Sequence, residues 1–243
     1  MKASTPTRFR RDYRTVAVRP QSGAFVVRLD ERALKTTAGA DLAAPTWALA
    51  NSIADEWANA GDPVDLAAMP FTRLAFAAID RGPIDRVKWR EDILAFLRSD
   101  LLCYRAAGPI ALVRRQNEVW SPFLEWAREA TGVALLTTAG LAAVSQPDAA
   151  MAALSAYVAR LDDWTLIAVR RASEVAGSGV LALALEAGAF APEVIFAAAR
   201  LDERFQRERW GVDEEAAARE AAIESEFISL ARFLAVIKQS VDR

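Results

Sequence analysis

The chain has 243 residues, no histidine, one cysteine and a formal net charge of −2. Histidine titrates near neutral pH and is the commonest metal ligand, so a Ser-His-Asp or Cys-His triad and a His-based zinc or iron site are excluded. The near-neutral charge does not describe a nucleic-acid binder, and Cys103 alone cannot form an intrachain disulfide. Catalysis would need carboxylates, hydroxyls, Lys or Arg. An unusual enzyme, an active site completed by another subunit and a binding protein all fit this composition, and we take the binding protein as the leading interpretation.

Residues 13–43 contain short alternating runs separated by turn residues, a pattern typical of antiparallel strands. Tyr13–Val18 and Ala24–Leu29 flank a turn at Gln21–Gly23, and shorter runs follow at Ala33–Thr36 and Asp41–Ala43. A sheet this small needs another element against its apolar face. We expect a β-rich N-terminal domain over residues 1–43, with a boundary that could extend into the first helices.

From Pro45 onward the apolar period is helical. Helices are expected to begin at Pro45, near Pro83, at Ser121-Pro122 and at Pro147. The expected apolar stripes are Trp47, Ala50, Ile53 and Trp57 in the first helix; Ile84, Val87, Leu94 and Leu97 in the second; and Ile223, Phe227, Leu230, Leu234 and Ile237 in the last. The predicted fold class is α+β, with a small antiparallel β domain ahead of a larger, mostly α-helical domain over residues 44–243.

The sequence shows no membrane-spanning or targeting segment. No apolar stretch approaches the ~18 to 20 residues that span a bilayer. The basic first eleven residues are too short for a transit peptide and lack an apolar face. We expect a cytoplasmic protein that does not insert into membranes.

Several short motifs have a structural and a functional interpretation. Gly177-Ser-Gly179 matches part of a dinucleotide fingerprint, but a helical stretch precedes it where a strand is required. Close packing through small residues is the better interpretation. Cys103 is flanked by large apolar residues and is expected to be buried, while Asp100 and Arg105, beside the same apolar core, need polar partners. The segment 132–147 is irregular and could hold another short strand.

Residues 201–220 hold the densest charge of both signs in the chain. A helix is expected to end at Trp210-Gly211, and a new one to begin in the acidic run Asp213–Glu215, where carboxylates favour a helix N-terminus. Trp and Arg are the residue types most often found at binding hot spots. A partner-binding surface and a solvated helix hairpin both remain open from these residues alone.

The chain resembles the assembly chaperones of the F-type ATP synthase catalytic head, in the branch that acts on the alpha subunit (assembly factor 2). The most specific stretches are DLLCYR, from Asp100 to Arg105, and Q-x-x-R-W-G, from Gln206 to Gly211. The resembling stretches run in order along nearly the whole chain: Gly23–Asp30, Leu34–Thr36, Ile53–Trp57, Met69–Ala75, Ile79–Asp80, Ser99–Arg105, Gln116, Trp120, Gln146–Pro147, Gly177–Ser178, Leu181–Ala184, Gln206, Arg209–Gly211 and Glu215–Ala216.

The resemblance implies a cofactor-free, monomeric chaperone that binds the free alpha subunit until the alpha–beta ring closes. It also implies a functional glutamate after Trp210-Gly211, for which Glu214 and Glu215 compete. Trp57 matches a family tryptophan, which its helical pattern makes a core or interdomain residue. The expected partner-binding residues are Arg207, Trp210, Glu214 and Glu215.

Two other classes stay open. An enzyme would use Asp213, Glu214 or Asp100 on a small polar substrate, and would need a concave pocket with convergent carboxylates. A helical scaffold would serve an unrelated partner. The resemblance favours the chaperone, for which no catalytic residue is expected.

Overall fold

The computed structural model describes residues 8–140, 142–210 and 214–239, apart from the side chain of Trp210. Internal contacts divide the chain into two compact units. Unit 1 comprises residues 1–86, 163–167 and 232–243, and unit 2 comprises residues 87–162 and 168–231. The α+β class is confirmed, because a small antiparallel sheet accompanies a helical majority. The domain boundary expected after residue 43 stays a prediction.

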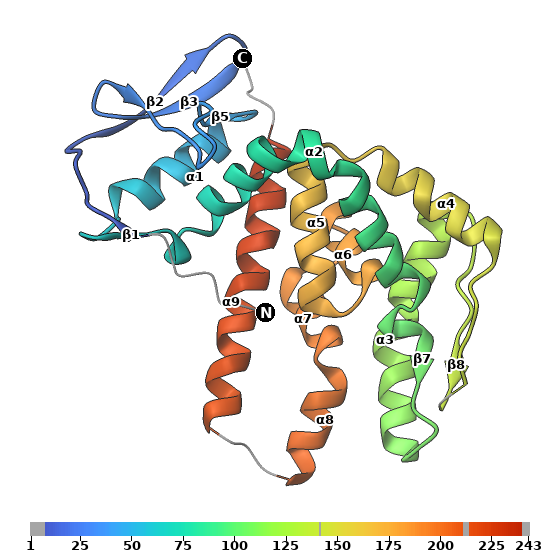
Figure 1. The fold of residues 1–243 in the computed structure, drawn as a ribbon. Coiled ribbons are helices and arrows are strands. Elements are labelled where there is room, and N and C mark those ends of the chain that lie inside the picture. Colours follow the sequence, from blue (N-terminus) through green and yellow to red (C-terminus); the bar gives the residue numbers. More distant parts are fainter. Residues whose placement is uncertain (1–7, 141, 211–213, 240–243) are drawn as a thin grey trace. The chain divides into compact units, whose positions relative to one another are not determined.

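The sheet of unit 1 is built on a long hairpin (Figure 1). β2 (Val16–Gln21) pairs antiparallel with β3 (Ala24–Leu29), and the short β4 (Arg32–Ala33) and β5 (Ala43–Ala44) also pair with β3. The hairpin turn has φ of +83° at Gly23, a conformation that glycine adopts without strain. The antiparallel strands predicted from the alternating pattern are confirmed. Outside this sheet, β1 (Arg8–Phe9) pairs with β6 (Val64–Asp65).

Helix α1 (Trp47–Ala58) supplies the partner that the sheet requires. Thr46 caps it by accepting a hydrogen bond from the Leu49 amide. Its buried face consists of Leu49, Ala50, Ile53, Ala54 and Trp57. The expected stripe is therefore right except at Trp47, which is 45% exposed and contacts the edge of the Phe25 ring.

Helix α2 (Pro70–Arg98) corrects the expectation that a helix begins near Pro83, because Pro83 lies inside it. The helix starts at residue 70 because the half-buried Glu56 carboxylate accepts hydrogen bonds from the Phe71 and Thr72 amides, at 2.7 and 2.8 Å. These amides belong to the first turn, which lacks intrahelical acceptors. The expected stripe is also wrong at its start, since Ile84 and Val87 are 70% and 66% exposed.

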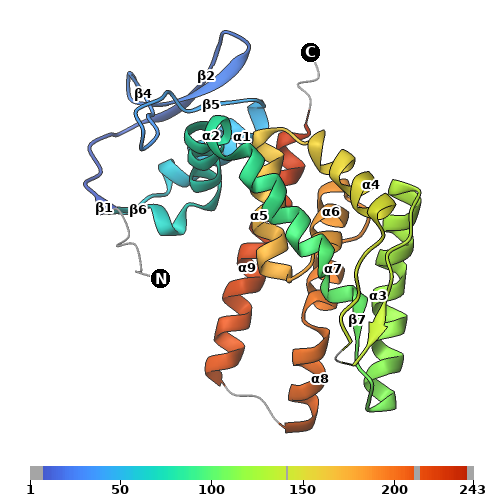
Figure 2. The ribbon, with the colours of Figure 1, turned by 45° about the vertical axis from the view of Figure 1, so that its right-hand side comes forward.

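Unit 2 is mostly helical. In it, α6 (Gly179–Ala187) packs against α3 (Ile110–Thr131) and α7 (Pro192–Ala199) (Figure 2). Helix α3 encloses Pro122, so the expected start at Ser121-Pro122 is wrong; the helix ends at Gly132, whose φ is +78°. The short strand expected in 132–147 is present as β8 (Thr138–Ala139), parallel to β7 (Tyr104–Arg105). The 3-10 helices of the chain are η1 (Leu66–Ala68) and η2 (Leu101–Cys103). The remaining helices are α3 (Ile110–Thr131), α4 (Asp148–Ala159), α5 (Asp163–Ala176), α6 (Gly179–Ala187), α7 (Pro192–Ala199), α8 (Leu201–Trp210) and α9 (Glu214–Ile237).

The core of unit 2 forms around α6, in which every residue from Gly179 to Leu185 is buried. Trp120 and Phe123 of α3 are also fully buried. On α9 the predicted stripe is buried at Phe227, Leu230 and Leu234, and half-buried at Ile223 and Ile237. Within the described ranges, no helix is long and apolar enough to cross a membrane.

Candidate functional site

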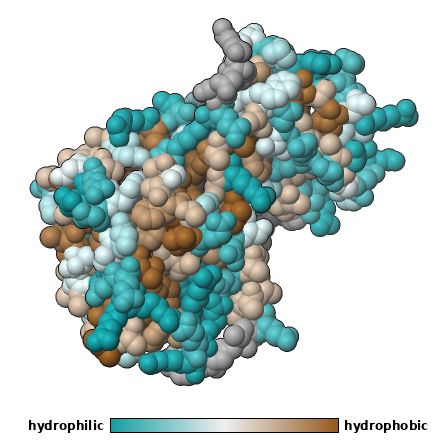
Figure 3. Space-filling model, turned by 180° about the vertical axis from the view of Figure 1, so that it is seen from behind, coloured by the Kyte–Doolittle hydropathy of each residue, from teal (hydrophilic) through white to brown (hydrophobic). Residues whose placement is uncertain are grey.

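Helix α8 and residues 214–226 of α9 form a pair of helices, here called the α8–α9 arm. None of its described residues from Gln206 to Glu226 is buried. In Figure 3 the arm, beside the grey residues at its end, carries teal and pale residues with few brown ones. Most helical stability in proteins comes from packing an apolar face. From Gln206 to Glu226 the arm therefore lacks the buried apolar face that usually stabilises a helix.

Ion pairs cross the arm and hold its two helices together. Glu220 on α9 lies 3.1 Å from Arg204 Nε, and its other carboxylate oxygen contacts Arg207. Burial acts to raise the pKa of Glu220, but the hydrogen bonds and charges of Arg207 and Arg204 outweigh it and lower the pKa. Arg207, with 25% of its side chain exposed, therefore stabilises the arm.

The other residues expected to bind a partner lie at the free end of the arm. Glu214 and Glu215 begin α9, both are exposed, and Arg219 lies 3.3 Å from Glu215. Carboxylates in the first turn interact favourably with the helix dipole. The side chain of Trp210 and all of Gly211 and Asp213 lie outside the described residues, while Gln206 is exposed on α8.

Sequence reasoning missed Glu220 as the residue that organises the arm. The available signal was weak: one acid on α9, opposite two arginines three residues apart on α8. Such a pairing can be recognised only once it is known which faces of the two helices meet. The binding roles proposed for Arg207, Trp210, Glu214 and Glu215 stay predictions.

Asp100, from the DLLCYR stretch, lies in the interior of unit 2. Its carboxylate accepts hydrogen bonds from the Leu102 amide, the Ser178 hydroxyl and the Val180 amide, at 3.0, 2.8 and 2.9 Å. Burial raises the pKa of Asp100 to about 6 against the effect of these donors. One side chain thus caps both η2 and α6, so its role is structural.

The Gly177-Ser-Gly179 motif completes this junction. Ser178 accepts a hydrogen bond from the Leu181 amide and so caps α6. A Cβ at Gly179 would lie 2.5 Å from Cγ of Leu97, which belongs to α2. The motif follows a helix, α5, and the packing interpretation is the one that the structure supports.

Arg105 is also held inside unit 2. It donates to the Gln116 carbonyl and lies 5.1 Å from the Trp120 ring centroid, and burial lowers its pKa. Cys103 is fully buried, and burial raises the pKa of its thiol to about 12. The thiolate is the nucleophilic form of cysteine, so this residue does not act as a nucleophile near neutral pH.

Trp57 is a core residue of unit 1, with 2% of its surface exposed. Its indole N–H donates to the Thr72 hydroxyl at 3.1 Å, and its carbonyl accepts from the Tyr13 hydroxyl at 2.7 Å. The Phe9 ring stacks on it at a centroid distance of 5.7 Å. Of the two positions left open for this residue, the core is the one observed.

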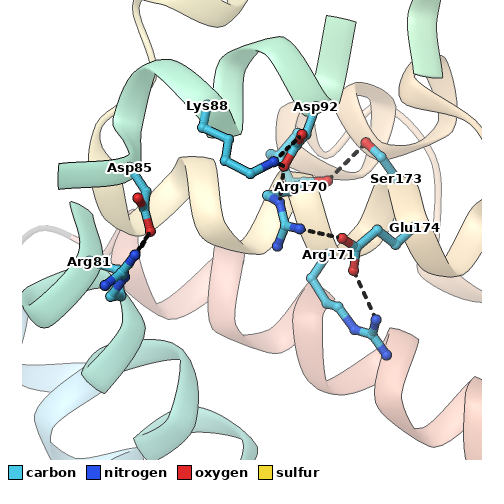
Figure 4. A network of polar contacts seen from close by, with 9 residues as sticks. Arg81, Asp85, Lys88, Asp92, Arg170, Arg171, Ser173 and Glu174 are labelled. Atoms are coloured by element: carbon cyan, nitrogen blue, oxygen red, sulfur yellow. Dashed lines mark hydrogen bonds and ion pairs between the residues drawn. The ribbon is translucent and has the colours of Figure 1, made fainter. Parts of the chain in front are cut away.

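A chain of ion pairs runs across α2, α5 and α9 within unit 2, and Figure 4 shows its part on α2 and α5. The contacts are Lys88–Asp92 at 2.9 Å, Asp92–Arg170 at 2.7 Å, Arg170–Glu174 at 2.7 Å, Glu174–Arg171 at 2.9 Å and Arg171–Glu226 at 2.6 Å. Each carboxylate in it faces a cation. Among the described residues, no group of three His, Cys, Asp or Glu side chains could hold a metal ion.

Comparison with known proteins identifies the family. The family model of the ATP12 chaperone protein matches residues 10–128. Atp12 from Paracoccus denitrificans, whose crystal structure is known, is 37% identical, with a TM-score of 0.89 over 94% of this chain and 98% of that one. The chain belongs to the ATP12 chaperone family.

Two further proteins are similar to this chain over most of their length. The Atu1473 protein from Agrobacterium tumefaciens is 38% identical, with a TM-score of 0.89 over 94% of this chain and 86% of that one. Protein atp12, mitochondrial, from Schizosaccharomyces pombe is 29% identical, over 88% of this chain and 79% of its own. The family expected from the sequence is confirmed. The arm lies beyond the residues that the family model matches.

Proposed function

We propose that this ATP12-family protein is an assembly chaperone of the F-type ATP synthase catalytic head, which binds the free alpha subunit until the alpha–beta ring forms. Family membership over nearly the whole chain carries this proposal. Subunits of an obligate ring expose large apolar interfaces before assembly, and such surfaces aggregate. A cytoplasmic, monomeric chaperone could cover them without hydrolysis or a cofactor.

The α8–α9 arm is the surface that we propose for this contact. It supports the role because none of its described residues from Gln206 to Glu226 is buried, while Arg204, Arg207 and Glu220 keep its helices together. Glu214 and Glu215 would contact the subunit through their exposed charges. Charged rims act mainly on association rate and specificity, which suits a partner that must later be displaced.

A pull-down from the organism's own lysate, read by mass spectrometry, tests the function. The tagged protein should enrich free alpha subunit without stoichiometric beta subunit. Failure to enrich it, with a folded bait and alpha subunit detectable in the input, contradicts the proposal. Enrichment of a different protein would favour the helical scaffold.

The enzyme alternative has less support. Asp100 is fully buried and bonded to three donors from the protein itself, so it cannot reach a substrate. Glu214 is exposed in the first turn of α9. These two carboxylates do not converge on a common cavity, which general acid–base chemistry would need.

A further inference from the structure

Unit 1 contains an open cleft of about 700 Å³, lined mainly by residues 52–71. Its walls come from α1, from the segment between α1 and α2, from the first turn of α2 and from the end of α9. The volume lies within the range of about 300–1,000 Å³ usual for ligand pockets. Nothing in the fold of unit 1 requires this space to stay open.

The apolar part of the cleft includes Pro63, Ala68, Phe71 and Val236. Pro63 and Ala68 are exposed, and Phe71 and Val236 are half-buried. Burial of such surface gains about 25 cal/mol per Å² removed from water. An aliphatic side chain of a partner would therefore be stabilised here.

The charged part is dominated by carboxylates. Glu56, Asp55 and Asp65 line the cleft with a single cation, Arg232. Glu56 already accepts from the start of α2, and Asp65 pairs with Arg8 at 3.3 Å. Within the described ranges, the side chains of Asp55 and Arg232 make no hydrogen bond or ion pair, and both are exposed.

The position of Glu56 adds to the negative character of the cleft. Burial raises the pKa of Glu56, against the hydrogen bonds from Thr72 and Phe71. A carboxylate held partly out of water interacts more strongly with a nearby cation than an exposed one does. Arg73 acts on Glu56 and Arg8 pairs with Asp65, so Asp55 is the lining carboxylate whose charge no ion pair of the described residues offsets, and it favours a basic occupant.

We propose that this cleft binds an extended segment of the free alpha subunit that carries an aliphatic side chain next to a lysine or arginine. The aliphatic side chain packs against Phe71 and Val236, and the cation lies beside Asp55. This inference rests on the function proposed above. It adds a second contact, formed mainly by α1 and by the segment between α1 and α2.

Three variants test the cleft through the affinity for purified, monomeric alpha subunit. Asp55→Lys should weaken binding at least tenfold, because it places a cation where the partner's cation lies. Ala68→Trp should weaken it as strongly by filling the apolar part. Arg232→Glu should strengthen binding several-fold, because it removes the one cation from the lining.

Glu31→Lys is the matched control, since it makes the same charge change on a fully exposed side chain of unit 1 outside the cleft. It should alter the affinity less than twofold. Circular dichroism and thermal melting confirm that each variant folds. A scan of overlapping alpha-subunit peptides should show binding to segments with Lys or Arg beside an aliphatic residue, and Ala68→Trp should abolish it.

The outcomes separate this inference from the proposed function. If Asp55→Lys and Ala68→Trp bind the alpha subunit as tightly as wild type does, the cleft is not a binding site, while the proposed chaperone function stands. If the wild-type protein does not bind the alpha subunit, both the cleft proposal and the proposed function are contradicted. Weaker binding by Arg232→Glu would show an acidic occupant, and loss of self-association in Ala68→Trp would show a second copy of this chain; either result overturns the proposal.

Discussion

The interior and the α8–α9 arm both carry polar residues from the stretches that resemble the family, and they use them in opposite ways. Asp100 and Arg105 are enclosed by backbone and side-chain partners of unit 2. Glu214 and Glu215 stand exposed at the start of α9. Polar residues near these stretches therefore divide into those enclosed in the interior and those at the surface of the arm.

The largest expected effect comes from Trp57, on the interior side of this comparison. Trp57→Ala should lower the free energy of unfolding by about 3–5 kcal/mol, because it leaves a cavity and removes the hydrogen bond that the indole donates to Thr72. Urea denaturation followed by circular dichroism measures the loss. Trp57→Phe keeps most of the packing and should cost much less. An alanine variant as stable as wild type would contradict the assignment of Trp57 to the core of unit 1.

Asp100→Asn should cost about 2–4 kcal/mol in unfolding free energy. The amide keeps the shape of the carboxylate but turns one acceptor into a donor, which then faces the Val180 amide or the Ser178 hydroxyl. Urea denaturation followed by circular dichroism measures this loss of unfolding free energy. Ser178→Ala, which removes one of the partners, is the milder comparison, and an Asn variant milder than Ser178→Ala would contradict the assigned role.

The stability difference between wild type and Asp100→Asn should depend on pH. The folded-state pKa of Asp100, about 6, lies above its usual 3.8, so the folded protein binds the proton more tightly than the unfolded chain. This stabilisation is complete only well below pH 3.8 and is lost as the pH rises through 6. The gap should therefore widen by about 2 kcal/mol between pH 7 and pH 4. Parallel curves for the two proteins would refute the shift.

On the arm, reversing both Glu214 and Glu215 to lysine should change binding but not folding. The unfolding free energy should stay within about 0.5 kcal/mol of wild type, because both side chains are exposed. Affinity for the free alpha subunit should fall at least tenfold. Glu118→Lys with Glu129→Lys makes the same charge change on exposed residues of α3 and should have little effect. Unchanged binding in the arm variant would exclude these glutamates from the contact.

The smallest effect is expected for Arg207→Ala, which breaks the pair with Glu220. Partly exposed ion pairs contribute about 0–1 kcal/mol, and Arg204 still reaches the same carboxylate. The loss should shrink further in 0.5 M salt, since added ions screen such pairs. A large loss of stability would mean that the arm depends on this contact for its fold.

The sequence predicted the strand hairpin and the family, but not how single positions are used. The alternation of residues 24–29 identifies β3, because every second side chain in it must face the core. The prolines at 83 and 122 misled the helix boundaries, since a helix tolerates an internal proline where the tertiary contacts of its neighbours maintain it. Ile84 and Val87 are apolar yet exposed, and no local pattern shows which face of a helix meets solvent.

The site was predictable only in part, for a similar reason. Charge density pointed to residues 201–220, and the exposed glutamates there agree with it. The commitment of Arg207 to Glu220, and the convergence of Asp55, Phe71 and Arg232 on one cleft, depend on contacts between segments far apart in the chain. Such contacts follow from the three-dimensional fold, which spacing along one segment does not contain.

The hydrogen bond from Ser178 to Asp100 joins residues 78 positions apart, so it cannot form until the ribosome has added Ser178. At a synthesis rate of about 5–20 residues per second, roughly 4–16 s pass between the addition of Asp100 and that of Ser178. During that time its carboxylate remains in water and the start of α6 does not exist. The interior of unit 2 therefore closes only late in translation, and this chaperone is itself a nascent chain with unburied surface before it can shield another.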